Sequence, residues 1–408
     1  MLVHRISIQI PKRHRLVYFG SSGINLLKNY ISESDAIVYR PPTVEINIWI
    51  ALRSLIYGIP SQATYYRSFL AWTKPSWVVT REDNNETFYR TKHYLPNCKA
   101  LSIQNGRRDS FSSQLGQNFW KALKRIAADG LTVDIVGTMG PPWSHYFSDA
   151  LKESGAKIIE IGSVKNNAVP TTVDSGENIE RLVLISSFPN LGSHQDFDDY
   201  GDKTFGFWAG ESFSYRSTFR IEAVLARLAA EYAQRHSLAF AVLGKRPSWQ
   251  PSEERYFTQS IGGYPFTYIP LRTEASSYEA VRDTDIIVTS DSSLGYEFFA
   301  RGLRVAFVSG RMTEAGKPEI PDCDFGYPEI QEKFGPFWTK SGSRGEFERV
   351  VSFAHRATNQ TWRESTLDLR TRLMIFDPEN HLLCGLLNQL GIPNSGPSFW
   401  TNTPIPEK

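Results

Sequence analysis

Short apolar runs that end in polar or glycine-rich residues recur along the chain, with helix-like stretches between them. The most informative run spans residues 286–307. Here an apolar strand, Ile286–Thr289, leads into a serine-rich turn, a helix that ends near Arg301, a break at Gly302 and a second apolar strand. Strands that are apolar throughout are typical of a parallel sheet covered on both faces. The pattern therefore predicts a βαβ unit at this point.

The same alternation predicts two successive α/β domains. We expect one domain over residues 1–170, a second over residues 171–365, and a helical tail over residues 366–408. The tail either crosses back to the first domain or mediates dimerisation. Strands are expected at Arg15–Tyr18, Ala36–Tyr39, Trp77–Thr80, Ala100–Ile103, Val133–Val136, Ile158–Ile161, Leu182–Ser186, Leu238–Leu243 and Phe266–Ile269.

Composition narrows the class of protein. The 408 residues are 41% hydrophobic and 22% charged, and the formal net charge is only +2, so nucleic acid is not predicted as a partner. The three cysteines are widely spaced and form no CxxC pair, which indicates a reducing compartment. The N-terminus lacks a long apolar run. We therefore expect a cytoplasmic protein that is either free in the cytoplasm or located at the inner face of the inner membrane, with at most peripheral membrane association.

The serine-rich turn is the candidate nucleotide site. A helix N-terminus presents backbone N–H groups and partial positive charge to a phosphate, and an acidic residue one turn later can accept hydrogen bonds from a ribose. An ordinary capped βαβ unit has the same features, so both interpretations stay open. The nucleotide-binding candidates are Lys245, Arg246, Ser290, Ser292, Ser293, Gly295 and Glu297.

Polar residues also follow the expected strands of the first half. A carboxylate at such a position is a candidate general base, although it is equally typical of an Asx-turn or helix cap. Amides suit sugar hydroxyls, and arginines suit an anionic group unless they are simply solvated. The catalytic candidates are Asp83, Glu160 and Glu211. The sugar- and acceptor-binding candidates are Asn84, Asn85, Gln104, Asn105, Arg107 and Arg108.

Several common catalytic motifs are absent from the sequence. It contains no HExxH, no GxSxG and no Walker A loop, which argues against the common metalloproteases, hydrolases and NTPases. Residues 194–213 are expected to form a long acidic and aromatic loop. Its Asp196-Phe197-Asp198 matches a bare D-x-D pattern, which arises easily by chance in an acidic stretch. No metal and no cofactor are predicted.

Taken together, the motifs resemble those of bacterial surface carbohydrate biosynthesis proteins, which are GT-B-like. The resemblance covers residues 15–355. The segments that carry it, in chain order, are Asp83-Asn84-Asn85, Gln104-Asn105-Gly106-Arg107-Arg108, Ile161-Gly162-Ser163, Asp291-Ser292-Ser293-Leu294-Gly295-Tyr296-Glu297 and Gly335-Pro336-Phe337-Trp338-Thr339.

This resemblance implies an α/β fold of two Rossmann-like parallel-sheet domains that face a central cleft. In plan the family is similar to the retaining β-Kdo transferases, which use CMP-Kdo. By that similarity Ser292 and Ser293 would hold the nucleotide phosphate and Glu297 the ribose. The first domain would hold the acceptor and supply catalytic groups. In the Kdo enzymes a carboxylate is the proposed nucleophile, and the candidates here are Asp83, Glu160 and Glu211, in that order.

The expected function is therefore a glycosyltransferase of lipopolysaccharide O-antigen or capsule biosynthesis. It would move a sugar, with Kdo from CMP-Kdo as the first donor to consider, onto a glycan or lipid-linked glycan acceptor. A UDP-sugar 2-epimerase shares the fold and is the alternative enzyme. A non-catalytic nucleotide- or sugar-binding partner of an assembly complex is the alternative from another class. The sequence leaves the nucleotide base, the stereochemistry, the acceptor and the oligomeric state open.

Overall fold

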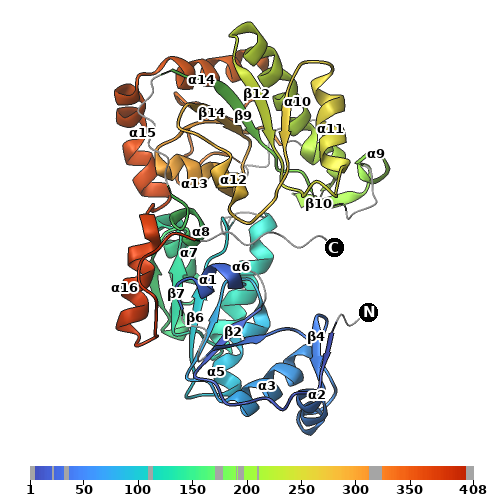
Figure 1. Cartoon of the computed structure of the whole chain (residues 1–408), viewed down its shortest axis with the longest axis vertical. Helices are drawn as coiled ribbons and strands as arrows, with labels where there is room; N and C mark the ends of the chain where they lie inside the picture. Colours follow the sequence, from blue (N-terminus) through green and yellow to red (C-terminus); the bar gives the residue numbers. More distant parts are fainter. Residues whose placement is uncertain are drawn as a thin grey trace. The chain divides into compact units, whose positions relative to one another are not determined.

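The computed structural model divides the chain into two compact units (Figure 1). It describes residues 5–20, 23–31, 36–108, 114–170, 178–189, 191, 197–208, 211–311 and 324–400, with the backbone alone at 114–117, 206–208, 211 and 213. The first unit comprises residues 1–108, 118–168 and 377–400. The second comprises residues 109–117, 169–376 and 401–408.

The first unit is built on a six-stranded parallel sheet in the order β3-β2-β5-β6-β7-β8. The four inner strands are almost entirely buried because helices cover both faces, and the edge strands β3 and β8 are largely half-buried. The chain order reverses between β2 and β5. The strands are β2 (Leu16–Phe19), β3 (Ala36–Tyr39), β5 (Trp77–Thr80), β6 (Lys99–Ile103), β7 (Ile135–Thr138) and β8 (Lys157–Glu160).

A two-stranded parallel ribbon, β1 (Arg5–Ser7) with β4 (Glu45–Asn47), lies outside this sheet. Asn47 ends the ribbon and caps the next helix, since its side chain accepts hydrogen bonds from the N–H groups of Trp49 and Ile50. The helices of the chain up to the second unit's sheet are α1 (Ile24–Lys28), α2 (Ile48–Ser54), α3 (Gln62–Thr73), α4 (Glu86–Tyr89), α5 (Thr91–Tyr94), α6 (Gln114–Ala128), α7 (Pro141–Ala150) and α8 (Val164–Asn167), with 3₁₀ turns at Leu55–Tyr57 and Lys152–Ser154.

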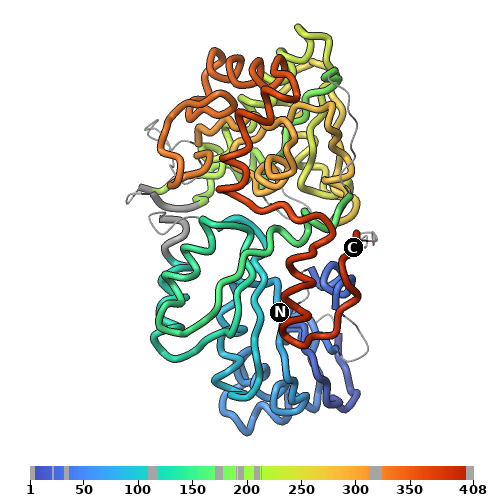
Figure 2. Tube along the Cα trace, turned by 90° about the vertical axis from the view of Figure 1, so that its left-hand side faces the viewer, coloured from blue at the N-terminus to red at the C-terminus, as the bar shows by residue number. Residues whose placement is uncertain are grey.

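Residues 377–400, which follow the second unit's helices in the chain, belong to the first unit. Figure 2 shows this segment, which includes a 3₁₀ turn (Pro378–Asn380) and α16 (His381–Gln389), alongside helix α1. The Tyr30 hydroxyl donates to the carbonyl of Ser398 at 2.7 Å, and the Asn380 amide donates to the Tyr30 oxygen at 2.8 Å. The N–H of Asp377 donates to the Asn167 side chain at 3.0 Å. These buried polar contacts fix the tail against α1 and α8.

The second unit is built on another six-stranded parallel sheet, in the order β13-β12-β9-β14-β15-β16. In chain order this is 3-2-1-4-5-6, the order of dinucleotide-binding Rossmann sheets, and its direction reverses between β9 and β14. Two parallel-sheet, Rossmann-like units confirm the predicted fold class. The strands are β9 (Arg181–Ile185), β12 (Ala239–Leu243), β13 (Thr267–Ile269), β14 (Asp285–Thr289), β15 (Arg304–Val308) and β16 (Trp338–Thr339).

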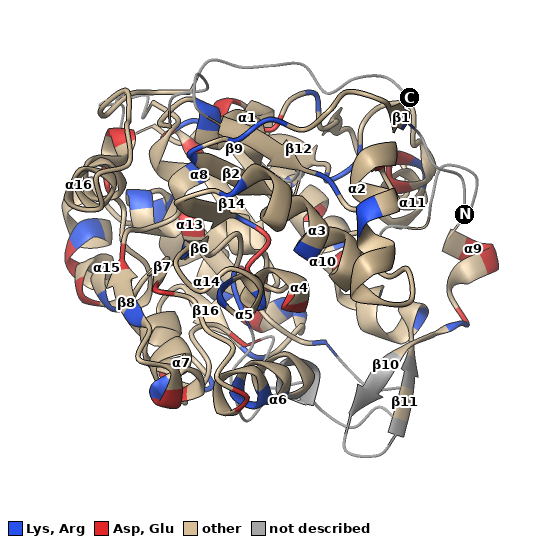
Figure 3. Cartoon of the chain, turned by 90° about the horizontal axis from the view of Figure 1, so that it is seen from below, with Lys and Arg blue, Asp and Glu red and all other residues tan. Residues whose placement is uncertain are grey.

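Helices surround this second sheet. The longest, α10 (Tyr215–Arg235), begins at a capping box formed by Ser214 and Ser217 and buries the face that carries Ile221 and Leu225. Figure 3 shows that α15 carries charges of both signs. Among the described residues no helix is long and apolar enough to cross a membrane. The other helices are α11 (Ser252–Ile261), α12 (Ser276–Glu279), α13 (Ser293–Arg301), α14 (Arg344–Arg356) and α15 (Asn359–Leu373).

The loop predicted over residues 194–213 is wrong where the structure describes it. Helix α9 (Phe197–Tyr200) is followed by an antiparallel hairpin of β10 (Thr204–Trp208) and β11 (Glu211–Ser214). The sequence contains the period-two alternation of Phe205 and Phe207 that a strand requires. The acidic and glycine residues around it are typical of a loop, which is why a loop was predicted.

Candidate functional site

The carboxyl ends of β9, β12, β14 and β15 bring polar residues to one edge of the second sheet. Ligands of open α/β sheets bind outside these strand ends, at the point where the strand order reverses. Here that point lies between β9 and β14, which are hydrogen-bonded neighbours. The residues that directly follow the four strands include Ser186, Lys245, Ser290, Asp291 and Arg311.

Arg311 is the central cation of this edge. Its guanidinium donates two hydrogen bonds to the Asp291 carboxylate, at 3.0 and 2.8 Å, and a third to the carbonyl of Thr218 at 3.0 Å. The same group lies 4.9 Å from the centre of the Phe219 ring. Arg311 is buried, so this two-pronged pairing fixes both its position and its orientation.

Glu222, on α10, is a buried carboxylate beneath the same edge. It accepts hydrogen bonds from the Ser290 hydroxyl at 2.8 Å and from the N–H of Ser187 at 3.3 Å, and it lies 3.7 Å from Arg311. Burial raises the pKa of Glu222, and the charge of Arg311 only partly opposes that shift. Because one arginine faces two carboxylates here, a proton on Glu222 would balance the charge of the cluster.

Glu253, on α11, organises the end of β12. Its carboxylate accepts hydrogen bonds from the N–H groups of Lys245 at 3.0 Å and Arg246 at 2.8 Å, and from the Tyr268 hydroxyl at 2.8 Å. It also accepts a hydrogen bond from the Ser186 hydroxyl. These bonds tie the loop after β12 to the loop after β9.

The backbone that carries the Lys245 and Arg246 side chains is therefore fixed by the Glu253 carboxylate. Arg246 donates to the carbonyl of Phe188, which follows β9, at 3.2 Å. Much of the Lys245 side chain is exposed to solvent. Even so, the protein around its ammonium group lowers the pKa of Lys245, Arg246 lowers it further, and the charge of Asp291 acts in the opposite direction. Lys245 is thus within electrostatic reach of the residues that follow β14.

The serine-rich turn and α13 have a specific close contact. Ser292 occupies the N-cap position, as predicted, but its hydroxyl makes no capping bond, and its N–H donates to the Thr289 hydroxyl at 3.2 Å. Gly295, in the first turn of the helix, packs on Thr289 so closely that an added Cβ would lie 2.6 Å from the threonine methyl. Ser292 and Ser293 are both half-buried. Helix α13 is therefore held directly against the end of β14.

Glu297 is buried one turn further along α13. It accepts a hydrogen bond from the Tyr278 hydroxyl at 2.7 Å. Burial lowers the pKa of Arg301, and the charge of Glu297 acts on that arginine in the opposite direction. The carboxylate predicted to meet a ribose is thus engaged with protein groups in this structure.

In the first unit, Asp83 is fully buried at the end of β5. Arg108 donates to both of its carboxylate oxygens, from Nε to Oδ2 at 3.0 Å and from Nη2 to Oδ1, and the N–H of Asn105 donates to Oδ1 at 3.3 Å. Burial raises the pKa of Asp83 and the Arg108 charge lowers it. The structure therefore joins two predicted site residues to each other, and Arg108 is engaged by Asp83.

The remaining predicted residues of the first unit have varied surroundings. Gln104 is buried and joins two strand ends, since its amide donates to the carbonyl of Gly106 at 2.8 Å and accepts from the N–H of Met139 at 2.9 Å. Asn85 caps α4, as the alternative interpretation expected. Asn84 is exposed, whereas Arg107 and Glu160 are half-buried.

Some predicted residues lie outside the described side chains. The structure describes only the backbone of Glu211, and His194 and Asp196 fall outside the described residues. Across the described part of the chain, no three His, Cys, Asp or Glu side chains are grouped as a metal site would require.

Sequence reasoning missed Glu222, Glu253 and Arg311. Glu222 stands between Phe219 and Leu225 on a helix face that is otherwise apolar. A charged residue on the core-facing side of a helix is rare unless it is paired, so the position of Glu222 in the sequence could have indicated a buried ion pair. Nothing in the sequence pairs Glu222 with Arg311, because 89 positions separate them.

A family profile described as "putative O-antigen biosynthesis protein" matches residues 101–391, well over half of the chain. The chain belongs to this family. That confirms the predicted assignment to bacterial surface carbohydrate biosynthesis.

Solved structures with the same fold are distant in sequence. UDP-GlcNAc 2-epimerase from Methanocaldococcus jannaschii is 10% identical, with a TM-score of 0.50 over 93% of this chain and 100% of that chain. Anabaena HepE, in complex with UDP, is 9% identical, with a TM-score of 0.50 over 92% of this chain and 100% of that chain. A search of curated proteins finds no match. At this identity the structural likeness establishes the GT-B-type fold alone.

Proposed function

We propose that the protein is a glycosyltransferase of O-antigen assembly that binds a nucleotide-sugar donor at the switch point of its second sheet. The observation that carries the proposal is the presence of two cationic side chains, Arg311 and Lys245, at that edge of the sheet. Arg311 is fixed by its hydrogen bonds to Asp291, and Lys245 projects from a loop whose backbone is bonded to Glu253. A diphosphate or monophosphate needs positive charge and N–H donors at the end of a parallel strand. The first turn of α13 would supply the N–H donors, beyond the Ser292 N–H that is bonded to the Thr289 hydroxyl.

The donor sugar has two candidates. The resemblance to β-Kdo transferases supports CMP-Kdo. The two structures of the same fold reported above support a uridine nucleotide, because one is a UDP-GlcNAc 2-epimerase and the other is a complex with UDP. A glycan or lipid-linked glycan would be the acceptor, because the family belongs to O-antigen biosynthesis.

Among the candidate catalytic carboxylates, the proposal places Glu160 first. Asp83 is completely buried and paired with Arg108, so it cannot approach a sugar without losing that pair. Glu160 ends β8 and is half-buried, so its carboxylate remains reachable. We expect Glu160→Gln to lower kcat by at least about a hundredfold while nucleotide binding persists, the loss typical of an acid–base group. Wild-type turnover of this variant would remove Glu160 from the mechanism.

The deciding experiment offers CMP-Kdo and UDP-sugars to the purified protein, with and without lipid-linked glycan acceptors. Sugar transfer that requires an acceptor supports the proposal. Release of UDP and an epimerised sugar without acceptor would instead assign a 2-epimerase. Nucleotide binding without turnover under either condition would assign a non-catalytic partner of an assembly complex.

A further inference from the structure

An apolar face of the first unit lies open to solvent. Among the described residues fourteen large hydrophobic side chains are exposed, and nine of them fall between positions 6 and 59. Monomeric proteins rarely leave such a concentration uncovered unless it is an interaction site. The nine residues, which we call the apolar face, are Ile6, Ile8, Ile10, Ile48, Trp49, Leu52, Leu55, Ile56 and Ile59.

The apolar face is one structural feature rather than scattered residues. In α2 and the 3₁₀ turn after it, the exposed positions 48, 49, 52, 55 and 56 follow the helical repeat and share one side. In the extended segment that begins with β1, the exposed isoleucines alternate at positions 6, 8 and 10. The Trp49 indole donates to the carbonyl of Ile8 at 2.9 Å, so the two segments are joined.

Helix α2 buries Ile50 and Ser54 but turns its other large apolar residues outward, and the 3₁₀ turn after it does the same. Ser54 is buried and Arg53 is half-buried, whereas Leu52 and Ile56 point outward and are 56% and 78% exposed. A helix that presents leucine, isoleucine and tryptophan to the outside matches those that lie flat in the boundary between lipid headgroups and acyl chains.

Positive charge accompanies the isoleucine segment of the apolar face. The first 81 residues contain ten Lys and Arg against three Asp and Glu, whereas the remaining residues contain thirty-five against forty. Arg5, Lys12 and Arg13 are exposed within or directly after the isoleucine segment. Such an excess repels a second copy of the same face and attracts an anionic lipid surface.

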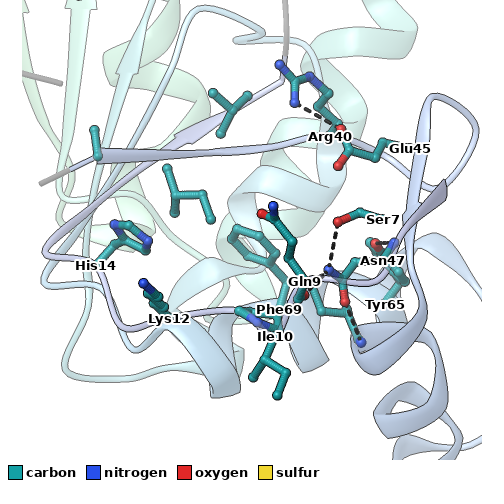
Figure 4. Close-up of a pocket in the computed structure, with 15 residues that line it drawn as sticks. Ser7, Gln9, Ile10, Lys12, His14, Arg40, Glu45, Asn47, Tyr65 and Phe69 are labelled. Carbon is teal, nitrogen blue, oxygen red and sulfur yellow. Dashed lines mark hydrogen bonds and ion pairs between the residues drawn. The ribbon is translucent and has the colours of Figure 1, made fainter. Parts of the chain in front are cut away.

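A pocket of about 770 Å³ opens beneath the isoleucine segment. Figure 4 shows Lys12 and His14 together at one side of it and Asn47 and Tyr65 at the other. Phe69 also lines it, and Arg40 is paired with Glu45 at 3.0 Å. Cationic and aromatic walls of this kind suit a phosphate-bearing headgroup whose chains remain in the bilayer.

We infer that the first unit docks on an anionic phospholipid bilayer, with the apolar face inserted at the interface and Lys12 and Arg13 on the headgroups. The inference is independent of the nucleotide proposal because it uses none of the same residues. It would hold the protein where a lipid-linked acceptor is presented.

The test is co-sedimentation of the full chain with vesicles of phosphatidylcholine plus phosphatidylglycerol, and with vesicles of phosphatidylcholine alone. The apolar variant combines Ile56→Glu with Ile59→Glu, at positions 78% and 87% exposed, and the charge variant combines Lys12→Glu with Arg13→Glu. The matched controls are Leu367→Glu, an exposed leucine of the second unit, and Lys152→Glu with Lys157→Glu.

We expect the wild type to bind the anionic vesicles only, and salt to weaken that binding. The apolar variant and the charge variant should each bind roughly tenfold or more weakly, whereas both controls should bind like the wild type. All these positions are exposed, so the melting temperature should stay at the wild-type value. Failure of the wild type to bind, or wild-type binding by both face variants, would overturn the inference. A lipid-free dimer that Ile56→Glu dissociates would also overturn it and assign the face to a second copy.

Discussion

Asp83 and Glu222 are fully buried carboxylates, one in each unit, and each faces an arginine at the end of a parallel strand. Removing such a charge from water is costly, and the arginine and neighbouring N–H groups offset that cost only while the pair is intact. Both residues therefore act as anchors that fix the polar loops around them. For Asp83 this anchoring explains the burial better than contact with a substrate does.

Loss of Arg108 should be severe for this reason. Arg108→Ala leaves the Asp83 charge buried without its partner, so we expect the free energy of unfolding of the first unit to fall by about 3 kcal/mol. The matched control is Arg125→Ala, which removes an exposed pair with Glu86 and should cost less than about 1 kcal/mol. Urea unfolding measures both. Equal effects of the two substitutions would contradict the anchoring role of Asp83.

Titration of Glu222 should make the free energy of unfolding depend on pH. Its pKa is raised above the ordinary value of 4.5, so in the window above that value the folded protein holds a proton that the unfolded chain releases. The free energy of unfolding must then fall as pH rises through the window. Glu222→Gln cannot titrate, so its stability relative to wild type should improve as pH rises from about 4.5 and then level off. Denaturant titrations across that range check the sign, and an opposite slope would show that the pKa is lowered.

At the scale of elements, the strands of the two six-stranded sheets were predictable to within two residues because both faces of each sheet are covered, except for the two-residue edge strand β16, which no prediction included. Helices were harder to predict. No clear apolar repeat marks α3 or α11, because the buried positions of both helices include tyrosine and serine, and those of α11 also include glutamate. Tertiary packing, rather than the apolar repeat, decides those elements.

The packing of α13 on β14 makes a prediction at this scale. Gly295→Ala places a methyl group 2.6 Å from the Thr289 side-chain methyl, so the helix must shift and stability should fall by about 1–3 kcal/mol. Adding Thr289→Ser removes that methyl but keeps the hydroxyl that accepts from Ser292, and should recover most of the loss. Thermal melts of the single and double variants measure the coupling.

The control for that experiment is Gly345→Ala in α14, where an added Cβ meets nothing within 4 Å. Alanine favours helices over glycine by up to about 1 kcal/mol, so this variant should be neutral or slightly stabilised. If Gly295→Ala behaved like Gly345→Ala, the close contact between α13 and β14 would not be a constraint on the site.

For the whole molecule, the positions of the polar loops could be predicted because these loops follow apolar strands. The hydrogen-bond partners of the loop residues could not be predicted. Asp83 and Arg108 were assigned separate roles and are instead bonded to each other. Ser290 is a nucleotide-binding candidate in the sequence, and its hydroxyl instead donates to Glu222. Long-range pairs of this kind depend on how helices pack against the sheet, and a single sequence carries no record of that.

The most direct test of the account is calorimetric titration of UDP, CMP, CDP and GDP into the wild type, Lys245→Glu and Lys333→Glu. Lys333 is an exposed lysine of the same unit and serves as the control. We expect UDP or CMP to bind the wild type and Lys333→Glu equally, and to bind Lys245→Glu about tenfold or more weakly, because that variant loses a charged phosphate contact. Absence of nucleotide binding to the wild type, or undiminished binding to Lys245→Glu, would contradict the assignment of the nucleotide site to this sheet edge.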